Sequence, residues 1–266
     1  MSAVDIAGLT KVFNHGAVDQ VDALLDIDLS IASGEFVSLI GPSGCGKSTL
    51  LRLIANLIEP TTGTLVVNGK SAKQARLDQD YGMAFQQAGL FEWRSVAKNI
   101  ELPLELKGWD AKKRRDRALE MLELVKLADF ADHYPWQLSG GMQQRVAIAR
   151  ALAVHPSLLL MDEPFGALDE MTREHMQGEL LSICRASKTT VVFVTHSIPE
   201  AVYLSDRVVV MSPRPGRITE VINIGISGVR TDSTRDNADF YSGVSAVRSA
   251  LRGIEAAAEA RGIEDR

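Results

Sequence analysis

The chain has 266 residues, of which 45% are apolar, 24% charged and 6% aromatic. This length allows one large or two modest domains with a hydrophobic core, and so excludes a small protein held together by disulfides or metal ions. The formal net charge of −5 excludes a general electrostatic attraction to nucleic acid or to an anionic membrane surface. Two cysteines, Cys45 and Cys184, are too few for a disulfide framework or a cysteine metal cluster, and they fit a reducing compartment such as the cytoplasm.

No segment approaches the roughly 18 consecutive apolar residues that a membrane-spanning helix needs. The longest apolar runs, at 158–161 and 191–194, have the length of strands. The N-terminus lacks the cationic and apolar regions of a secretory signal. We therefore expect a chain that does not cross a bilayer by itself and is not exported by that route.

The first predicted elements are two strands, at 21–31 and 64–67. Turn signals follow each of them, at 33–34 and 68–69. These segments are typical of antiparallel strands. We expect them to form a small β layer beside the main sheet.

A glycine-rich loop separates a predicted strand at 36–40 from a helix that begins near Lys47. Its pattern, G-x4-G-K-[ST], in a strand-loop-helix context is that of a P-loop. The glycines let successive backbone N–H groups face phosphates, Lys47 reaches the β- and γ-phosphate oxygens, and Ser48 binds Mg²⁺. The predicted nucleotide-binding residues of this loop are Gly41, Ser43, Gly44, Cys45, Gly46, Lys47, Ser48 and Thr49.

Helical signals replace strand signals between about 89 and 156. Apolar residues at Ala118, Met121, Leu122 and Val125 recur at the spacing of one helix face. The short basic run at 112–115 has no exposed aromatic residues beside it and is interpreted as a solvated helix face, not as a nucleic-acid patch. We expect a helical insertion that splits the α/β domain.

Within this insertion, Ser139 stands before two glycines and a helix rich in alanine and arginine. Ser139 is a good N-cap, and Gly140 and Gly141 expose backbone N–H groups at the helix start. The segment is either a second anion site or only a capped helix start, and spacing alone leaves both open.

A buried strand at 158–161 leads directly into two carboxylates, Asp162 and Glu163. At a strand end near a P-loop, Asp162 can hold Mg²⁺ and Glu163 can polarise the water that attacks the γ-phosphate. A further strand at 191–195 precedes His196 and a helix from Pro199, and a last one lies at 208–211. Continuous apolar strands that alternate with helices predict a parallel sheet covered on both faces, and hence an α/β fold.

After Arg217 the composition shifts toward Gly, Ser, Asp and Asn. An amphipathic helix follows, with the apolar stripe Phe240, Val244, Val247, Leu251, Ile254 and Ala258. Docking on its own domain is the favoured interpretation, with dimer contact and regulation as alternatives. The expected domains are 1–225, with the helical subdomain at about 89–156, and an appendage at 226–266.

The segment 138–143, about twenty positions before Asp162, resembles the signature motif of ABC-type ATPases. Other motifs of that family follow in the same order and cover most of the chain. Phe13 resembles the aromatic that stacks on adenine, Gln86 the Q-loop glutamine, 167–169 the D-loop, and His196 the switch histidine. The resemblance implies a P-loop NTPase fold of ABC type, with a RecA-like parallel sheet core, an antiparallel β subdomain and an inserted α-helical subdomain.

The same resemblance implies the mechanism. Members dimerise head to tail, so Ser139, Gly140 and Gly141 of one subunit would bind the γ-phosphate held by Lys47 of the other. ATP and Mg²⁺ are the implied cofactors, with Ser48, Gln86 and Asp162 as metal ligands. ATP binding would close the homodimer, and hydrolysis, with Glu163, His196, Gln86 and Lys47 as catalytic residues, would reopen it.

Three kinds of P-loop protein fit these motifs. An unrelated kinase or GTPase needs no second glycine anion site. A soluble ABC-type ATPase of DNA repair or translation normally has a coiled-coil or zinc-bearing insertion or a second cassette, which this sequence lacks. In the loop 90–93, Phe91 and Trp93 place bulky apolar groups where a partner could bury them, although packing inside the helical insertion is also open. We therefore expect a transporter subunit.

The resemblance implies a peripheral subunit on the cytoplasmic face of the membrane, bound to separate permease subunits and acting indirectly with a solute-binding protein, with no nucleic-acid partner. The run 211–218 resembles the nitrate/sulfonate/taurine importer subfamily, which favours a small anion as solute. Two departures, Glu92 where proline is common and Asn56 where glycine is usual, keep importers of pyrimidine or vitamin precursors as alternatives.

Cys45 lies in the phosphate loop beside a helix N-terminus, a position that lowers the pKa of a thiol. We expect its alkylation by N-ethylmaleimide to block nucleotide binding and ATP to protect it. Cys184, in an apolar helical stretch, is predicted to be a buried core residue.

Overall fold

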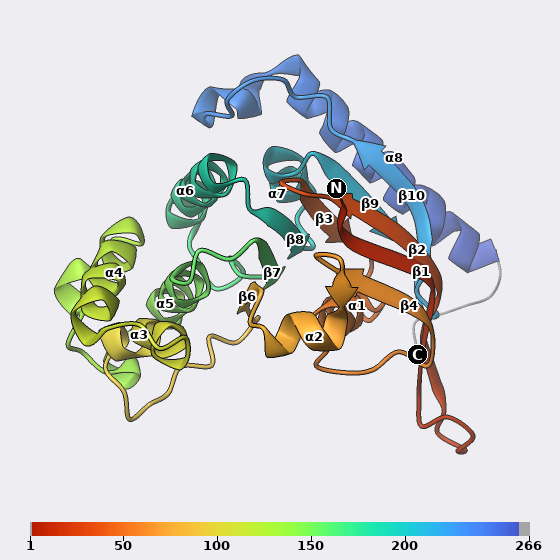
Figure 1. Cartoon of the computed structure of the whole chain (residues 1–266). Helices are drawn as coiled ribbons and strands as arrows, with labels where there is room; N and C mark the ends of the chain where they lie inside the picture. The colour runs from red at the N-terminus through yellow and green to blue at the C-terminus, as the bar shows by residue number, and fades with distance from the viewer. Residues whose placement is uncertain (1, 261–266) are drawn as a thin grey trace. The chain divides into compact units, whose positions relative to one another are not determined.

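The computed structural model describes residues 2–260 and divides into two compact units (Figure 1). The first unit combines the chain up to Gln79 with the chain from Thr190, and the second unit is Asp80–Thr189. Parallel and antiparallel strands occur together with helices, so the predicted α/β class is confirmed.

The first unit contains both the N-terminal and the C-terminal elements. In chain order they are β1 (Ser2–Phe13), β2 (Val21–Ala32), β3 (Phe36–Ile40), α1 (Lys47–Ile54), β4 (Thr62–Val67), β5 (Lys70–Ser71), α2 (Ala72–Leu77), β8 (Thr190–Val194), α7 (Ile198–Leu204), β9 (Arg207–Met211), β10 (Ile218–Asn223), the short 3-10 helix η3 (Asp232–Asp236) and α8 (Ala238–Ala260).

An antiparallel sheet of the first unit has the strand order β2-β1-β4-β5. The two strands predicted at 21–31 and 64–67 are both present, and both pair antiparallel with β1. Strand β1 was not expected from the sequence. Its alternation of buried and exposed residues is interrupted around Gly8, where the pairing register shifts, so the strand lacks a continuous two-residue period.

The other strands of the first unit are ordered β10-β9-β3-β8. β3 is parallel to β8 on one side and to β9 on the other, and every residue of β3 and β8 is buried. This confirms the expected parallel sheet for these strands. Because the strands run in one direction, the segments that follow Ile40, Val194 and Met211 all leave the same edge.

Helix α1 ends at Ile54, and Asn56, which follows the C-cap residue Ala55, is one of the positions where the sequence departs from the family pattern. Asn56 has φ 49°, in the left-handed region that glycine usually occupies after a helix. Asparagine tolerates that conformation better than other non-glycine residues, which explains its presence here. The backbone N–H of Leu57 then bonds to Arg52 O and completes the helix end.

The C-terminal segment packs on the first unit. Helix α8 lies against α7, β9 and β10 (Figure 1). A Cβ on Gly243 would lie 2.9 Å from Val202 of α7, and Phe240, Val244 and Val247 are buried. Arg230 is also buried and donates to Tyr203 O at 2.6 Å and Ser205 O at 2.7 Å, so it caps the end of α7. These contacts support docking of α8 on its own unit; the side chain of Ala258, part of the predicted stripe, lies outside what is described.

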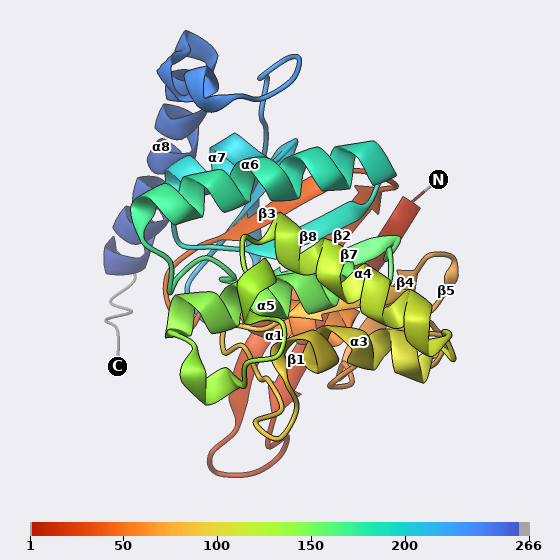
Figure 2. The same cartoon turned by 90° about the vertical axis from the view of Figure 1, so that its left-hand side faces the viewer.

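The second unit is mainly helical. Its elements are β6 (Tyr81–Ala84), α3 (Val96–Leu106), α4 (Ala111–Leu124), η1 (Ala128–Phe130), η2 (Pro135–Gln137), α5 (Gly140–Leu152), β7 (Leu158–Asp162) and α6 (Glu170–Ser187). Helices α3, α4 and α5 pack against one another (Figure 2). β6 is parallel to β7, and Gly82 of β6 is required there because a Cβ would lie 2.3 Å from Ala151 O.

Helix α4 confirms the helix face predicted from apolar spacing. Ala118, Met121 and Leu122 are buried, whereas Lys112 and Lys113 are exposed. Arg115 forms ion pairs with Glu101 and Asp132 of the same unit. The basic run is therefore partly neutralised by neighbouring carboxylates.

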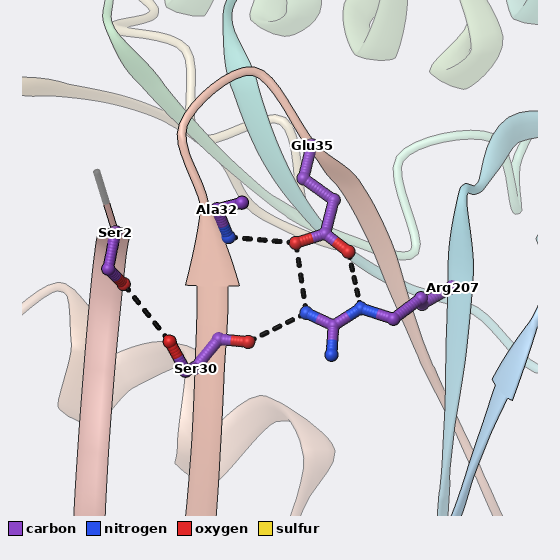
Figure 3. Close-up of a pocket in the computed structure, with 5 residues that line it drawn as sticks. All are labelled: Ser2, Ser30, Ala32, Glu35 and Arg207. Carbon is purple, nitrogen blue, oxygen red and sulfur yellow. Dashed lines mark hydrogen bonds and ion pairs between the residues drawn. The ribbon is translucent and has the colours of Figure 1, made fainter.

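A pocket of about 460 Å³ lies in the first unit and is lined by Ser2, Ser30, Ala32, Glu35 and Arg207 (Figure 3). The Arg207 guanidinium pairs with the Glu35 carboxylate and donates to Ser30 O at 2.6 Å. The carboxylate also accepts from Ala32 N at 2.8 Å. The charges satisfy each other, so this arrangement fastens β9 to the turn between β2 and β3.

In residues 2–260, none of the helices has the length and apolar character to span a bilayer.

Candidate nucleotide-binding site

The P-loop connects β3 to α1 in the first unit, as predicted. Gly44 and Gly46 have φ of 73° and 101°, which side chains with a Cβ rarely adopt. Gly46 is the N-cap of α1 and provides no side chain to bond the first helical N–H groups. Such a helix start can bind an anion through its backbone.

Lys47 is 7% exposed, and its ammonium folds back over the loop. Nζ donates to Gly41 O at 2.8 Å and to Pro42 O at 2.9 Å. In these two bonds, the acceptors of the buried Lys47 ammonium are neutral carbonyls and not carboxylates. A phosphate oxygen would be a stronger acceptor for the same N–H groups.

The pKa of the Cys45 thiol is shifted in the direction opposite to the expected one. Its side chain is buried, and burial raises the pKa of the thiol although Lys47, with Nζ 3.6 Å from Sγ, opposes that shift. The expectation of a lowered pKa was wrong because the loss of solvation outweighs the nearby positive charge. Cys184 is buried as predicted, and burial raises the pKa of its thiol to about 12.

His196 follows β8, at the edge where the P-loop also begins. Leu39 pairs with Val194, and Thr195 N donates to Leu39 O at 3.3 Å. The His196 side chain is exposed. Thr195 Oγ1 accepts from Ser197 N at 2.9 Å and bonds the buried Glu200 carboxylate, so these groups hold the connection that carries His196.

Phe13 ends β1 and is 37% exposed, unlike a core residue. Lys11 Nζ lies 4.9 Å from its ring centroid, which is within the range of a cation–π interaction. An exposed ring can stack on a base, so the position is compatible with the expected role.

In the second unit, Asp162 is the last residue of β7 and is 4% exposed. Glu163 follows with φ 47°, a strained backbone conformation for a residue with a side chain. Gln86 Nε2 lies 3.4 Å from Glu163 Oε2, so the structure brings these two predicted catalytic residues together. Backbone strain of this kind clusters at functional sites, which fits the role expected of Glu163.

Ser139 is the N-cap of α5, as predicted, and its hydroxyl accepts from Met142 N at 3.3 Å. A Cβ on Gly141 would lie 3.1 Å from Ala167 O, so the helix start lies against the predicted D-loop. Asp169 ends that loop and caps α6 by accepting from Thr172 N at 3.0 Å, a bond that lowers the pKa of its carboxyl.

Two side chains of α5 bind the backbone around Gln86. Gln144 is 3% exposed and donates to Phe85 O at 2.8 Å. Arg150 donates to Ala88 O at 2.8 Å and to Gly89 O at 2.9 Å. The helix that begins at the signature motif is therefore fastened to the segment that contains Gln86. Neither Gln144 nor Arg150 was expected from the sequence to have this role.

The aromatic loop after Gln86 is held by Asn99, another residue that the sequence analysis missed. Asn99 is 0% exposed; its Oδ1 accepts from Phe91 N at 2.7 Å, and its Nδ2 lies 3.0–3.1 Å from the carbonyls of Phe91, Arg94 and Ser95. Trp93 is 73% exposed and lies beside Phe91, with ring centroids 4.9 Å apart. Trp93 is therefore not a core residue of the helical insertion.

The predicted metal ligands are a hydroxyl, an amide and a carboxylate, from Ser48, Gln86 and Asp162. Hard oxygen donors of this type fit Mg²⁺, which also retains water and phosphate oxygens as ligands. Residues 2–260 contain no group of three or more His, Cys, Asp or Glu side chains placed to hold a metal ion.

Comparison with known proteins agrees with this geometry. The profile of the family described as "ABC transporter" matches residues 24–166. The nitrate import ATP-binding protein NrtD of Synechocystis is 44% identical over 258 residues, covering 95% of this chain and 96% of that protein. The taurine import ATP-binding protein TauB of Yersinia pestis is 49% identical over 207 residues, 76% of this chain and 78% of that protein.

A solved dimeric ATP-binding cassette in a post-hydrolysis state, bound to ADP and Pi, is similar in structure. Its TM-score is 0.77 at 37% sequence identity, and the match covers 84% of this chain and 100% of that one.

Proposed function

Because the chain belongs to the ABC transporter family, we propose that it is the ATP-binding subunit of a bacterial importer whose membrane-spanning permease is a separate polypeptide. Its relatives include proteins named for the import of nitrate and of taurine. ATP hydrolysis at the P-loop would drive solute uptake through that permease.

Two helix starts in one chain, which we take as backbone anion sites, support this proposal. The first is the P-loop, where α1 begins without a side-chain cap, and the second is the start of α5 at Ser139, Gly140 and Gly141. A monomeric nucleotide-binding protein needs only one such site for the terminal phosphate. A head-to-tail homodimer uses both, since each ATP is held by the P-loop of one copy and the α5 start of the other.

The roles of individual residues follow from their chemistry. Lys47 would exchange the Gly41 and Pro42 carbonyls for phosphate oxygens, and Phe13 would stack on adenine. In the second unit, Glu163 would polarise the attacking water while Gln86 orients it. His196 would contact the γ-phosphate.

Magnesium fits the donor set of the site. The Ser48 hydroxyl, the Gln86 amide and the Asp162 carboxylate would be its protein ligands. When bound, Mg²⁺ supplies charge neutralisation for the phosphate oxygens.

The exposed Trp93 supports a permease-docking role for the loop 90–93. The subunit would then lie peripherally on the cytoplasmic face of the membrane and act with a solute-binding protein only indirectly. We favour a nitrate-, sulfonate- or taurine-like anion as solute because of the two named relatives, with pyrimidine or vitamin precursors as the alternative. Measuring which solute is bound by the solute-binding protein that works with this subunit would decide between them.

The proposal is tested by nucleotide binding and hydrolysis of the Lys47→Ala variant. We expect loss of hydrolysis, because the variant lacks the charge that neutralises the phosphates. Lys73→Ala is the matched control, since Lys73 is an exposed lysine on α2 of the same unit. ATP binding and hydrolysis that are equal in Lys47→Ala and Lys73→Ala would contradict the assignment of the P-loop.

A further inference from the structure

The segment Met211–Ile218, which marks the resemblance to one importer subfamily, has no role in the function proposed above. It connects β9 to β10 in the first unit. Because Ile40 of β3 pairs with Val210 of β9 in parallel, Met211 leaves the sheet at the edge where the P-loop begins. Ligands of open parallel sheets bind beyond this edge.

Hydrogen bonds around Ser212 give this segment a defined turn. Ser212 N donates to Arg217 O at 2.9 Å, and Arg217 N donates to Ser212 Oγ at 3.0 Å. Ser212 Oγ also lies 3.1 Å from Pro213 O and 3.3 Å from Pro215 O. One serine side chain thus organises the whole turn, which two prolines stiffen further.

The turn is in direct contact with the P-loop. A Cβ on Gly216 would lie 2.0 Å from Cys45 O, and a Cβ on Gly41 would lie 2.6 Å from Met211 O. Gly216 also exchanges backbone hydrogen bonds with β2, to Ala23 O and from Leu25 N, both at 3.0 Å. The P-loop therefore has a fixed backbone support on this side.

The turn places Arg214 beside the P-loop. Its Nη2 atom lies 3.5 Å from the position that a Cβ would occupy on Gly44, a P-loop residue with φ 73°. The Arg214 side chain is exposed, and in the part of the chain that the structure describes it forms no ion pair with a carboxylate. A guanidinium beside a phosphate-binding loop, without a neutralising partner, is suited to bind phosphate oxygens.

We propose that Arg214 binds the phosphate chain of the nucleotide held by the P-loop, and that the turn around Ser212 positions it there. This inference rests on the proposed nucleotide binding and adds a residue to it. Arg214 contributes a second cation, distinct from Lys47, whose ammonium lies over the Gly41 and Pro42 carbonyls.

The test compares Arg214→Gln with Arg217→Gln in the full chain, using the fluorescent nucleotide mant-ATP as probe. Both arginines are exposed residues of the same turn, so the two variants lose the same charge. We expect Arg214→Gln to raise the Kd roughly 10- to 150-fold, the range for one charge-assisted hydrogen bond, and Arg217→Gln to change it less than about 2-fold. Arg214→Lys should recover part of the affinity.

Positioning by the turn is tested with Ser212→Ala, which removes the bond to Arg217 N without filling new space. We expect a smaller rise in Kd than for Arg214→Gln, and no further rise when Ser212→Ala is added to Arg214→Gln, because both act through one contact. Additive effects in the double variant would refute positioning by Ser212.

The controls separate this inference from the proposed function. Equal affinities of Arg214→Gln and Arg217→Gln, with wild type binding mant-ATP and Lys47→Ala failing to bind, would overturn only the role of Arg214. Absence of binding by the wild type would instead overturn the proposed function. Circular dichroism checks that each variant is folded, and because both arginines are exposed we expect neither substitution to unfold the chain.

Discussion

Replacing Asn99 with alanine removes the side chain that holds the aromatic loop. Asn99 is fully buried and contacts one backbone N–H and three carbonyls between Phe91 and Ser95. Because an amide has only two N–H hydrogens for the three carbonyls, these contacts amount to about three full hydrogen bonds. At about 1 kcal/mol for each neutral bond, the expected loss of stability is about 3 kcal/mol.

Differential scanning calorimetry measures this loss. At about 2–4 °C for each kcal/mol in a chain of this size, Asn99→Ala should lower the Tm by about 6–12 °C. Asn223→Ala is the control, because Asn223 is exposed at the end of β10, and it should change the stability by less than about 0.5 kcal/mol. A Tm for Asn99→Ala within 2 °C or so of the control would refute the idea that Asn99 organises the loop.

Two further predictions concern single side chains. Trp93→Ala should weaken association with the permease while leaving the ATPase activity and Tm of the isolated subunit nearly unchanged, because Trp93 is 73% exposed. Co-purification with the permease and ATPase assays test this. An equal loss of permease association and of ATPase activity would contradict it. Cys45 should react slowly with N-ethylmaleimide near pH 7.5, because burial raises the pKa of its thiol and leaves little thiolate below that pKa; the rate should increase as the pH rises toward the raised pKa and on unfolding. Native-state labelling of Cys45 as fast as that of a small free thiol would contradict the burial argument.

Local patterns in the sequence predicted much of the fold. Strands β3, β7 and β8 are fully buried, so their apolar runs were continuous and easy to recognise. The short strand β6 escaped notice because it contains Gly82, which is needed for the close approach of Ala151 O. Glycine is needed there because of a tertiary contact, and such a contact leaves no signal in the local sequence.

The residues of the site likewise divide into those that local motifs predict and those that they do not. Lys47 and Ser139 belong to motifs whose chemistry depends on neighbours in sequence, and both occupy the positions expected of them. Gln144, Arg150 and Asn99 bind backbone carbonyls, and for Gln144 and Arg150 these carbonyls are far away in sequence. Buried polar residues of this kind carry no periodicity that distinguishes them from surface residues.

Cys45 shows how a local rule can fail. The N-terminus of α1 and the adjacent Lys47 both favour the thiolate, and sequence alone reveals both. Burial of the side chain is a property of the folded unit, and it reverses the direction of the pKa shift. The raised pKa of Cys45 could be predicted only from knowledge of how the P-loop packs against the rest of the first unit.

In the proposed dimer, one ATP is shared between the P-loop of one copy and the α5 start of another. Sedimentation velocity of Glu163→Gln with saturating ATP and Mg²⁺ tests it most directly, since this variant should bind ATP but hydrolyse it very slowly. We predict an ATP-dependent dimer, and its loss in Glu163→Gln combined with Ser139→Phe, which blocks the α5 start while nucleotide binding at the P-loop is retained. A monomer in the single variant, or a dimer that persists in the double variant, would contradict the claim.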